Sequence, residues 1–93
     1  MKELEFDFSR IGSMTDFYQM AGRRWDLPEY FGNNLDALWD FVTGDAALPL
    51  RVRFVHLSLS QLETFGGLIG LFEDAATALE GALEFEYYLS KEY

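Results

Sequence analysis

The sequence contains no cysteine and a single histidine, His56. The absence of cysteine excludes disulfide bonds and thiolate chemistry, and one histidine without cysteine argues against a metal site. We therefore expect no metal and no cofactor. His56 lies at the carboxyl end of a predicted strand, where α/β folds often place sites, but no Ser/His/Asp set accompanies it. We interpret it as a structural or surface residue.

Long apolar runs and basic residues are also scarce. The N-terminal stretch MKELEFDF lacks the apolar core of a signal peptide, and no apolar run is long enough to span a bilayer. We therefore expect a cytoplasmic protein that does not contact membranes. Seven Lys and Arg stand against 16 Asp and Glu, which gives a formal net charge of -9 at pH 7. This balance argues against direct nucleic-acid binding and favours a cationic partner.

The 93 residues, 49% of them hydrophobic and 17% aromatic, are enough for a single domain over residues 1–93 with one core. Apolar and polar residues alternate in three stretches, which predicts three strands with one wet face each. The predicted strands are Lys2–Phe8, Leu50–Leu57 and Leu83–Leu89. In the last of them Leu83, Phe85, Tyr87 and Leu89 are expected to face the core.

Helical spacing of apolar residues predicts helices between these strands. The first begins at Ser13, with Phe17 and Ala21 on its buried stripe. A later helical region opens at Ser58 or Ser60, breaks at Gly66-Gly67 and closes at Gly81. Strands separated by helices imply parallel pairing through right-handed crossovers. The predicted fold is therefore α/β with two layers: a three-stranded parallel sheet in the order 1-2-3, and helices covering one face.

Charges on the wet face support this strand order. Acidic strands placed side by side would repel each other, whereas opposite charges on neighbouring strands attract. Arg51 and Arg53 on the second strand are therefore predicted to lie between the other two strands. The expected acidic neighbours are Glu3, Glu5 and Asp7 on one side and Glu84 and Glu86 on the other.

A helix between the first two strands carries the main functional signal. Asn34 is its predicted N-cap, and it runs to about Val42, with Gly44 as a left-handed C-terminal residue. Its core face is predicted from the spacing of apolar residues at Leu35, Leu38, Trp39 and Val42. Its opposite face carries Asp36 and Asp40, which are one turn apart.

The segment around this helix is acidic and lacks basic residues. Between Trp25 and Leu50 there are five carboxylates and no Lys or Arg: Asp26, Glu29, Asp36, Asp40 and Asp45. Asp36 and Asp40 could form a solvated acidic face, a charge pair for a cationic partner, or a glycosidase-type pair. Nothing in the sequence builds a pocket for the third alternative. Tyr30 and Phe31 could pack under the helix or serve as interface anchors.

The motif LPEYFGNNLDALWD, followed by Thr43-Gly44, resembles the signature of the barstar family, intracellular inhibitors of barnase-type ribonucleases. The resemblance spans nearly the whole chain. It implies a non-enzymatic protein, a monomer when free, whose second helix and preceding loop plug the active site of a basic ribonuclease. The partner-binding residues that it implies are Tyr30, Phe31, Gly32, Asn34, Asp36, Trp39, Asp40, Thr43, Gly44 and Asp74.

Within this set, the resemblance makes Asp40 the central anchor and Asp36 its support. Asp74 matches an acidic residue on the family's late helix, with Glu73 as the alternative. Phe31, Asn33 and Asp45 depart from the family's usual residues. Two rival hypotheses stay open: an interaction module of the same fold for another cationic protein, such as a different nuclease or toxin domain, and an enzyme that uses Asp36 and Asp40.

Overall fold

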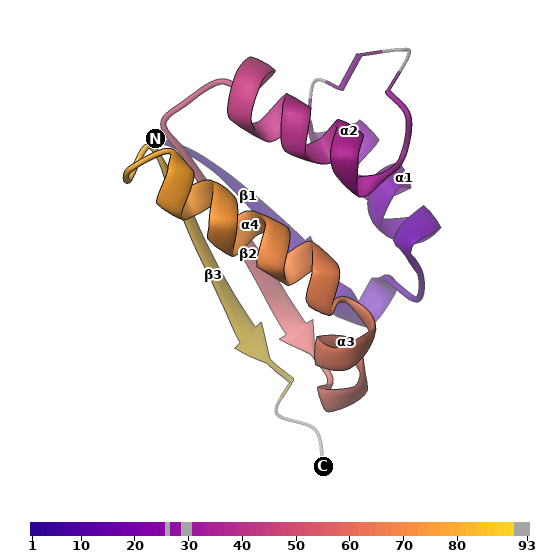
Figure 1. Cartoon of the computed structure of the whole chain (residues 1–93). Helices are drawn as coiled ribbons and strands as arrows, with labels where there is room; N and C mark the ends of the chain where they lie inside the picture. Colours follow the sequence, from indigo (N-terminus) through magenta and orange to yellow (C-terminus); the bar gives the residue numbers. More distant parts are fainter. Residues whose placement is uncertain (26, 29–30, 91–93) are drawn as a thin grey trace.

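The structure is a computed structural model that describes residues 1–25, 27–28 and 31–90. The elements follow one another as strand, helices, strand, helices and strand (Figure 1). They are β1 (Lys2–Asp7), η1 (Phe8–Arg10), α1 (Met14–Arg24), α2 (Leu35–Asp40), η2 (Phe41–Asp45), β2 (Leu50–Leu57), α3 (Leu59–Thr64), α4 (Gly66–Ala78) and β3 (Leu83–Leu89). Of the two η elements, η1 is a short 3₁₀ helix and η2 is a π-helix.

The three strands form a parallel sheet in the order β1-β2-β3. The predicted fold and strand order are therefore confirmed, as are the bounds of the second and third strands. The first strand ends one residue earlier than predicted, at Asp7, because the chain turns there into η1. Figure 1 shows α1 and α4 packed over the sheet, with α2 beside them.

Aromatic rings fill the core between the helices and the sheet. Phe54, at the centre of β2, is fully buried. Its ring meets Phe17 of α1 at 5.9 Å and Phe72 of α4 at 5.5 Å, both in edge-on geometry. In an edge-on pair the quadrupoles of the two rings attract each other, which adds to the stabilisation from burying their apolar surface. Because residues of two helices touch one residue of the central strand, one face of the sheet holds the whole core.

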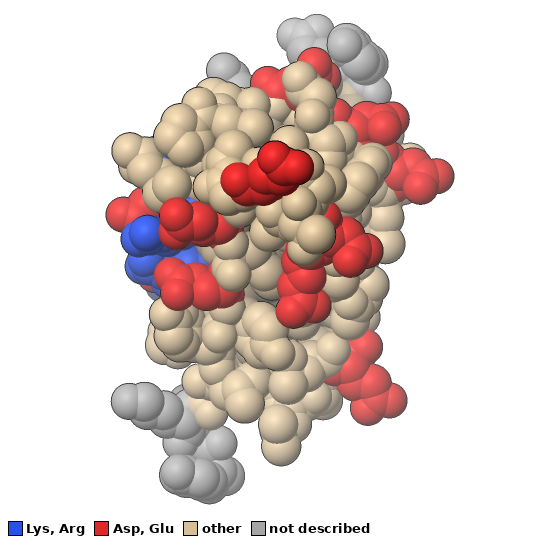
Figure 2. All heavy atoms as spheres, turned by 60° about the vertical axis from the view of Figure 1, so that its left-hand side comes forward, with Lys and Arg blue, Asp and Glu red and all other residues tan. Residues whose placement is uncertain are grey.

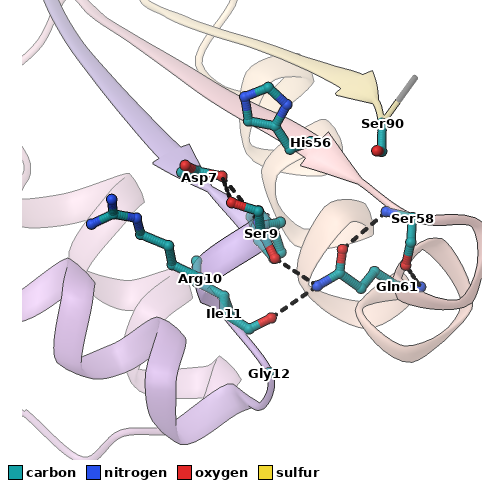
Figure 3. Close-up of a pocket in the computed structure, with 10 residues that line it drawn as sticks. Asp7, Ser9, Arg10, Ile11, Gly12, His56, Ser58, Gln61 and Ser90 are labelled. Atoms are coloured by element: carbon teal, nitrogen blue, oxygen red, sulfur yellow. Dashed lines mark hydrogen bonds between the residues drawn. The ribbon is translucent and has the colours of Figure 1, made fainter. Parts of the chain in front are cut away.

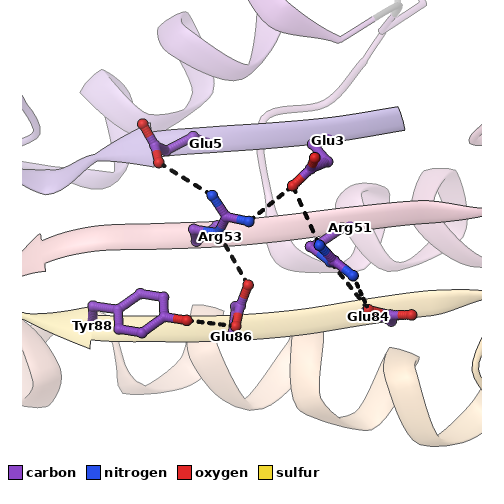
Figure 4. Close-up of polar contacts among 7 residues, drawn as sticks. All are labelled: Glu3, Glu5, Arg51, Arg53, Glu84, Glu86 and Tyr88. Carbon is purple, nitrogen blue, oxygen red and sulfur yellow. Dashed lines mark hydrogen bonds and ion pairs between the residues drawn. The ribbon is translucent and has the colours of Figure 1, made fainter. Parts of the chain in front are cut away.

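The opposite face of the sheet is wet and carries a network of ion pairs (Figure 4). Arg51 and Arg53 on β2 bridge carboxylates of both neighbouring strands, as predicted. The Arg51 Nη2 atom lies 2.9 Å from Glu84 Oε1, and the Arg53 Nη2 atom lies 2.8 Å from Glu3 Oε1. The remaining pairs are Arg51–Glu3 at 3.5 Å, Arg53–Glu86 at 3.0 Å and Arg53–Glu5 at 3.7 Å. We call this set the sheet network.

Asp7 does not join the sheet network, which corrects the prediction. Its Oδ1 atom accepts hydrogen bonds from the backbone N–H of Ser9 at 2.9 Å and from the Ser9 hydroxyl at 2.6 Å. The cause is the end of β1 at this residue, since Asp7 acts as the N-cap of η1. Its carboxylate therefore belongs to the loop after the strand.

Two predicted core positions on β3 are wrong. Tyr87 is 40% exposed and Leu89 is 46% exposed. The helical layer does not reach over this end of the edge strand. Phe65, at the junction of α3 and α4, packs instead on Phe8 of η1, with ring centroids 5.1 Å apart.

The break in the late helical region lies where the glycine pair predicts it. Helix α3 ends at Thr64 and α4 begins at Gly66. Ser58 is the N-cap of α3, in a capping box with Gln61. Gly81 has φ +90°, a left-handed conformation that suits glycine and closes the turn into β3. In the described part of the chain, no helix is both long and apolar enough to cross a membrane.

Candidate partner-binding surface

Asn34 fixes both the start of α2 and the loop before it. Its Oδ1 atom accepts a hydrogen bond from the backbone N–H of Ala37 at 2.8 Å, which confirms the predicted N-cap. Its Nδ2 atom donates to the carbonyl of Gly32 at 3.2 Å. The same loop is closed by a hydrogen bond from the Phe31 N–H to the Pro28 carbonyl at 3.0 Å. One side chain therefore sets the position of the loop relative to the helix.

The sequence predicted that the helix ends with Gly44 in a left-handed conformation, and this prediction is wrong. The helix widens into the π-helix η2, in which the backbone N–H of Ala46 donates to the Phe41 carbonyl at 2.8 Å. Such bonds between residues five apart are rare and occur often at functional sites. The Thr43 hydroxyl adds a bond to the Trp39 carbonyl at 2.7 Å. The wider turn brings Asp45 to the same side as Asp40.

A cavity of about 150 Å³ opens beside these two carboxylates. Its lining residues are Pro28, Phe31, Gly32, Ala37, Asp40, Phe41 and Asp45. Phe31 is half-buried, and its ring lies 5.9 Å from that of Tyr18. It therefore packs under the helix and lines the cavity at once. We call these lining residues, together with the exposed carboxylate of Asp36, the acidic surface.

The acidic surface unites part of the predicted site. Phe31, Gly32 and Asp40 line the cavity, while Asn34 orders the loop behind it. Asp36 is exposed on α2 without lining the cavity, and Asp74 is exposed on α4. Gly44 is exposed and Thr43 is half-buried. Tyr30 lies outside the described residues.

The helix also packs differently from the prediction. Leu38 and Val42 are buried and Trp39 is half-buried against the core, as expected. Leu35 is 38% exposed, so its assignment to the core was wrong. Phe41 is buried instead, with its ring 5.3 Å from Trp25. Phe41 and Val42 lie three and four residues after Leu38, which is regular helical spacing, so the predicted core face omitted a residue that the pattern allowed.

Sequence reasoning missed Pro28, Ala37 and Phe41 as lining residues and placed Asp45 at the margin. Asp40 and Asp45 are five residues apart, a spacing that does not place two side chains on one face of an α-helix. The acidic composition of the segment was the available signal for Asp45. Ala37 and Phe41 could have been found, because Ala37, Asp40 and Phe41 follow the helical spacing i, i+3, i+4. No comparable signal points to Pro28.

The acidic surface lacks compensation by cations. Among the described residues, Asp36, Asp40 and Asp45 take part in no ion pair, and no group of His, Cys, Asp or Glu could hold a metal ion. Figure 2 shows acidic side chains spread over one face of the molecule, with basic side chains at one margin between acidic neighbours. An uncompensated negative field attracts a positively charged partner. Because Asp36 lies outside the cavity that Asp40 lines, the two carboxylates share no pocket.

The fold and this surface define a class of protein: a small α/β domain that carries an acidic helix and loop on its surface. Residues 1–90 match the family described as Barstar (barnase inhibitor), and the chain belongs to this family. A Bacillus subtilis (strain 168) protein named "Putative ribonuclease inhibitor YrdF" is 38% identical over 68 residues. The match covers 73% of this chain and 66% of that protein, so the chain spans slightly less than two thirds of the relative.

Proposed function

We propose that this protein inhibits a small basic ribonuclease of the barnase type without catalysing a reaction itself. Helix α2 and the loop before it would cover the enzyme's active site. Membership of the barstar family and the name of the Bacillus subtilis relative support this function. The observation that carries it is the position of the family motif, which forms the uncompensated acidic surface around Asp40.

The mechanism follows from charge. A ribonuclease active site holds Arg, Lys and His side chains that bind RNA phosphates, and a carboxylate can occupy the place of a phosphate. Asp40 lies between Asp36 and Asp45 along the chain, so it would enter the cationic site most deeply. The two flanking carboxylates would steer the approach. Interface roles for Tyr30, Trp39, Thr43, Gly44 and Asp74 are proposed from the family motif, as is a monomeric free state.

An interaction module for a different cationic protein is the second candidate. Asp45 departs from the family's usual residue, and it lines the cavity beside Asp40. An extra carboxylate at this position changes the charge pattern offered to a partner. A nuclease of another type, or a basic toxin domain, would fit the same surface.

The test is a titration of a barnase-type ribonuclease with this protein, with RNA cleavage as the readout. We expect activity to fall in proportion to added protein until one molecule is bound per enzyme. Asp40→Ala should abolish this tight inhibition, whereas Glu84→Ala removes the same charge on the sheet network and should leave it intact. Full ribonuclease activity at saturating inhibitor would refute the proposal. Binding without inhibition would favour the second candidate.

A further inference from the structure

A second and larger cavity, of about 600 Å³, lies at the carboxyl edge of the sheet (Figure 3). All three strands contribute to it, through Asp7 at the end of β1, His56 near the end of β2 and Ser90 after β3. Ligands of open parallel sheets bind at this edge. This cavity shares no lining residue with the one beside Asp40. It is therefore a separate candidate site.

His56 has an unusual backbone conformation in this cavity. Its φ of +60° lies in the left-handed region, which is uncommon for residues other than Gly, although Asn, Asp and His occur there more often than the rest. The strand pairing with β3 shifts register between Phe54 and Leu57, as in a β-bulge. Bulges occur next to binding sites, where they change the direction of a side chain. Figure 3 shows the His56 ring on the same side of the strand ends as Asp7.

The walls of the cavity are held by local hydrogen bonds. The Gln61 Nε2 atom donates to the carbonyls of Phe8 and Ile11, both at 2.8 Å. The Gln61 Oε1 atom accepts from the Ser58 N–H at 2.9 Å. One side chain of α3 thus joins the loop after β1 to the end of β2. A binding site with fixed walls loses little conformational entropy when a ligand enters.

Arg10 supplies a cation to this cavity. The chain has seven Lys and Arg, of which Arg51 and Arg53 are engaged in the sheet network. The side chain of Arg10 lines the cavity and makes no hydrogen bond or ion pair within the described part of the chain, and the same holds for the side chain of His56. Both charges act on the carboxylate of Asp7. A guanidinium and an imidazolium are both hydrogen-bond donors suited to an oxyanion.

Asp7 is the described carboxylate in this cavity, and it is already bonded. The hydrogen bond from the Ser9 hydroxyl is the largest cause that lowers the pKa of Asp7, while burial opposes the shift and the positive charges of His56 and Arg10 add to it. Asp7 and Arg10 cancel in charge, so protonation of His56 leaves the cavity positive. The other described lining residues, from η1, α3 and the end of β3, carry no charge.

We propose that this cavity binds a phosphate group, either free or as the ester of a small molecule, through Arg10 and His56. Figure 3 shows the Arg10 side chain directed away from the His56 ring, with Asp7 between them, so binding requires that Arg10 turn toward the ring. Its guanidinium fork can then bind two phosphate oxygens, and a protonated imidazole can donate to a third. The volume exceeds that of the anion and lies in the range of small-molecule sites. The proposal is independent of ribonuclease inhibition, because the two surfaces share no residue.

The single histidine makes the test direct, since its ring protons give an unambiguous NMR signal. The wild-type protein is titrated with sulfate, which keeps its charge from about pH 5 to pH 8, and with inorganic phosphate and a sugar phosphate, all at constant ionic strength. We expect a saturable shift of the His56 signal, with tighter sulfate binding at the lower pH. If the sugar phosphate binds more tightly than inorganic phosphate, the site is for a phosphate ester. If the two bind equally, the site is for the free ion.

Matched variants separate this site from general salt effects. Arg10→Gln should weaken sulfate binding at least about tenfold, the effect of losing one hydrogen bond between charged groups. Arg23→Gln removes the same charge from the exposed end of α1 and should leave binding unchanged. His56→Gly should abolish sulfate binding, which calorimetry measures because this variant has no histidine signal. Its melting temperature should not fall, because glycine suits the left-handed conformation. A shift that does not saturate, or equal binding by the two arginine variants, would overturn the proposal.

Discussion

The sheet network and the acidic surface both carry carboxylates, but only the sheet network pairs them with cations. In the sheet network, each of the four glutamates lies within 4.0 Å of an arginine. On the acidic surface, Asp36, Asp40 and Asp45 have no cationic neighbour within the described residues. The first set therefore satisfies its charges within the fold. The second set has no counter-charge within the described fold.

The difference arises from how each element places its side chains. Register fixes cross-strand neighbours, so Arg51 and Arg53 on the central strand meet carboxylates from both sides. On α2, Asp36 and Asp40 are neighbours on one helix face, and like charges at this spacing destabilise a helix by roughly 0.2–0.5 kcal/mol. Asp36 lies in the first turn of α2, where the helix dipole stabilises a carboxylate by about 0.3–1 kcal/mol, but Asp40 lies beyond that turn. No cation of the described fold pairs with either side chain, so a cationic partner would add a stabilisation that the free protein lacks.

Asp40→Ala should produce the largest effect on partner binding. Removing one side of a buried charge pair costs about 2–5 kcal/mol, because the partner's cations stay buried without a counter-charge. We expect faster dissociation from the ribonuclease and little loss of fold stability, since Asp40 is exposed in the free protein. Dissociation rates measured by surface plasmon resonance check this. Asp45→Ala should have a much smaller effect, and an equal or larger one would show that Asp40 is not the anchor.

Association with the ribonuclease should be fast and salt-sensitive. Complementary fields raise association rates by about 10–10³-fold, and salt screens this gain. Stopped-flow measurements at low and high ionic strength would give the slope of the association rate constant against salt concentration. Asp36→Asn should reduce this slope, whereas Glu84→Gln, in the sheet network, should leave it nearly unchanged. Association that is independent of salt would rule out steering by the acidic surface.

Asn34 separates the stability of α2 from the order of the binding loop. Asn34→Ala removes the cap and should lower the free energy of unfolding by about 0.5–2 kcal/mol. Asn34→Asp keeps the acceptor for the Ala37 N–H but loses the donor to the Gly32 carbonyl. We expect near-normal stability in urea denaturation for this variant, with weaker partner binding. Equal binding by the Asp variant and the wild type would show that the Gly32 bond does not position the loop.

Breaking the sheet network should affect stability and spare binding. Arg53→Met leaves Glu3, Glu5 and Glu86 without their common cation. The pairs are solvent-exposed, so we expect a loss of stability smaller than that of Asn34→Ala and further reduced in high salt. Arg10→Met is the matched control, because Arg10 has no ion pair among the described residues. A similar loss in both variants would mean that the network contributes nothing specific.

The strands and their order could be predicted because two independent signals agree. Alternation of apolar residues gave the faces of β2, and the charges on the wet face gave its central place in the sheet. The N-cap at Asn34 and the break at Gly66 could also be predicted, because capping and glycine effects depend on local sequence. These features are properties of a few neighbouring residues.

The remaining features depend on geometry that residue types do not specify. The π-helix after Asp40 adds one residue to a turn, which brings Asp45 to the cavity that Asp40 lines. Regular spacing cannot reveal an irregular turn. The bulge at His56 likewise assembles a cavity from residues far apart in sequence. The family motif indicated where the acidic surface lies, but not that its residues enclose a cavity.

Tyr88 gives the smallest predicted effect and a pH signature for the sheet network. Its hydroxyl donates to Glu86 Oε2 at 2.6 Å, and this bond is the largest cause that lowers the pKa of Glu86, ahead of Arg53. A carboxylate whose pKa is lower in the folded protein stabilises it above the unfolded pKa, near 4.3, and that stabilisation disappears as pH falls through the folded pKa. The same bond raises the pKa of Tyr88, so its contribution also disappears above about pH 10.

Tyr88→Phe should therefore be slightly less stable than the wild type around neutral pH. The difference should shrink at both acidic and strongly alkaline pH, because the hydrogen bond needs a charged Glu86 and a neutral Tyr88. Urea denaturation across the pH range measures this difference. Tyr87→Phe is the control, since Tyr87 makes no side-chain hydrogen bond among the described residues. A difference between wild type and Tyr88→Phe that stays constant from acid to alkali would show that the bond to Glu86 does not link this carboxylate to stability.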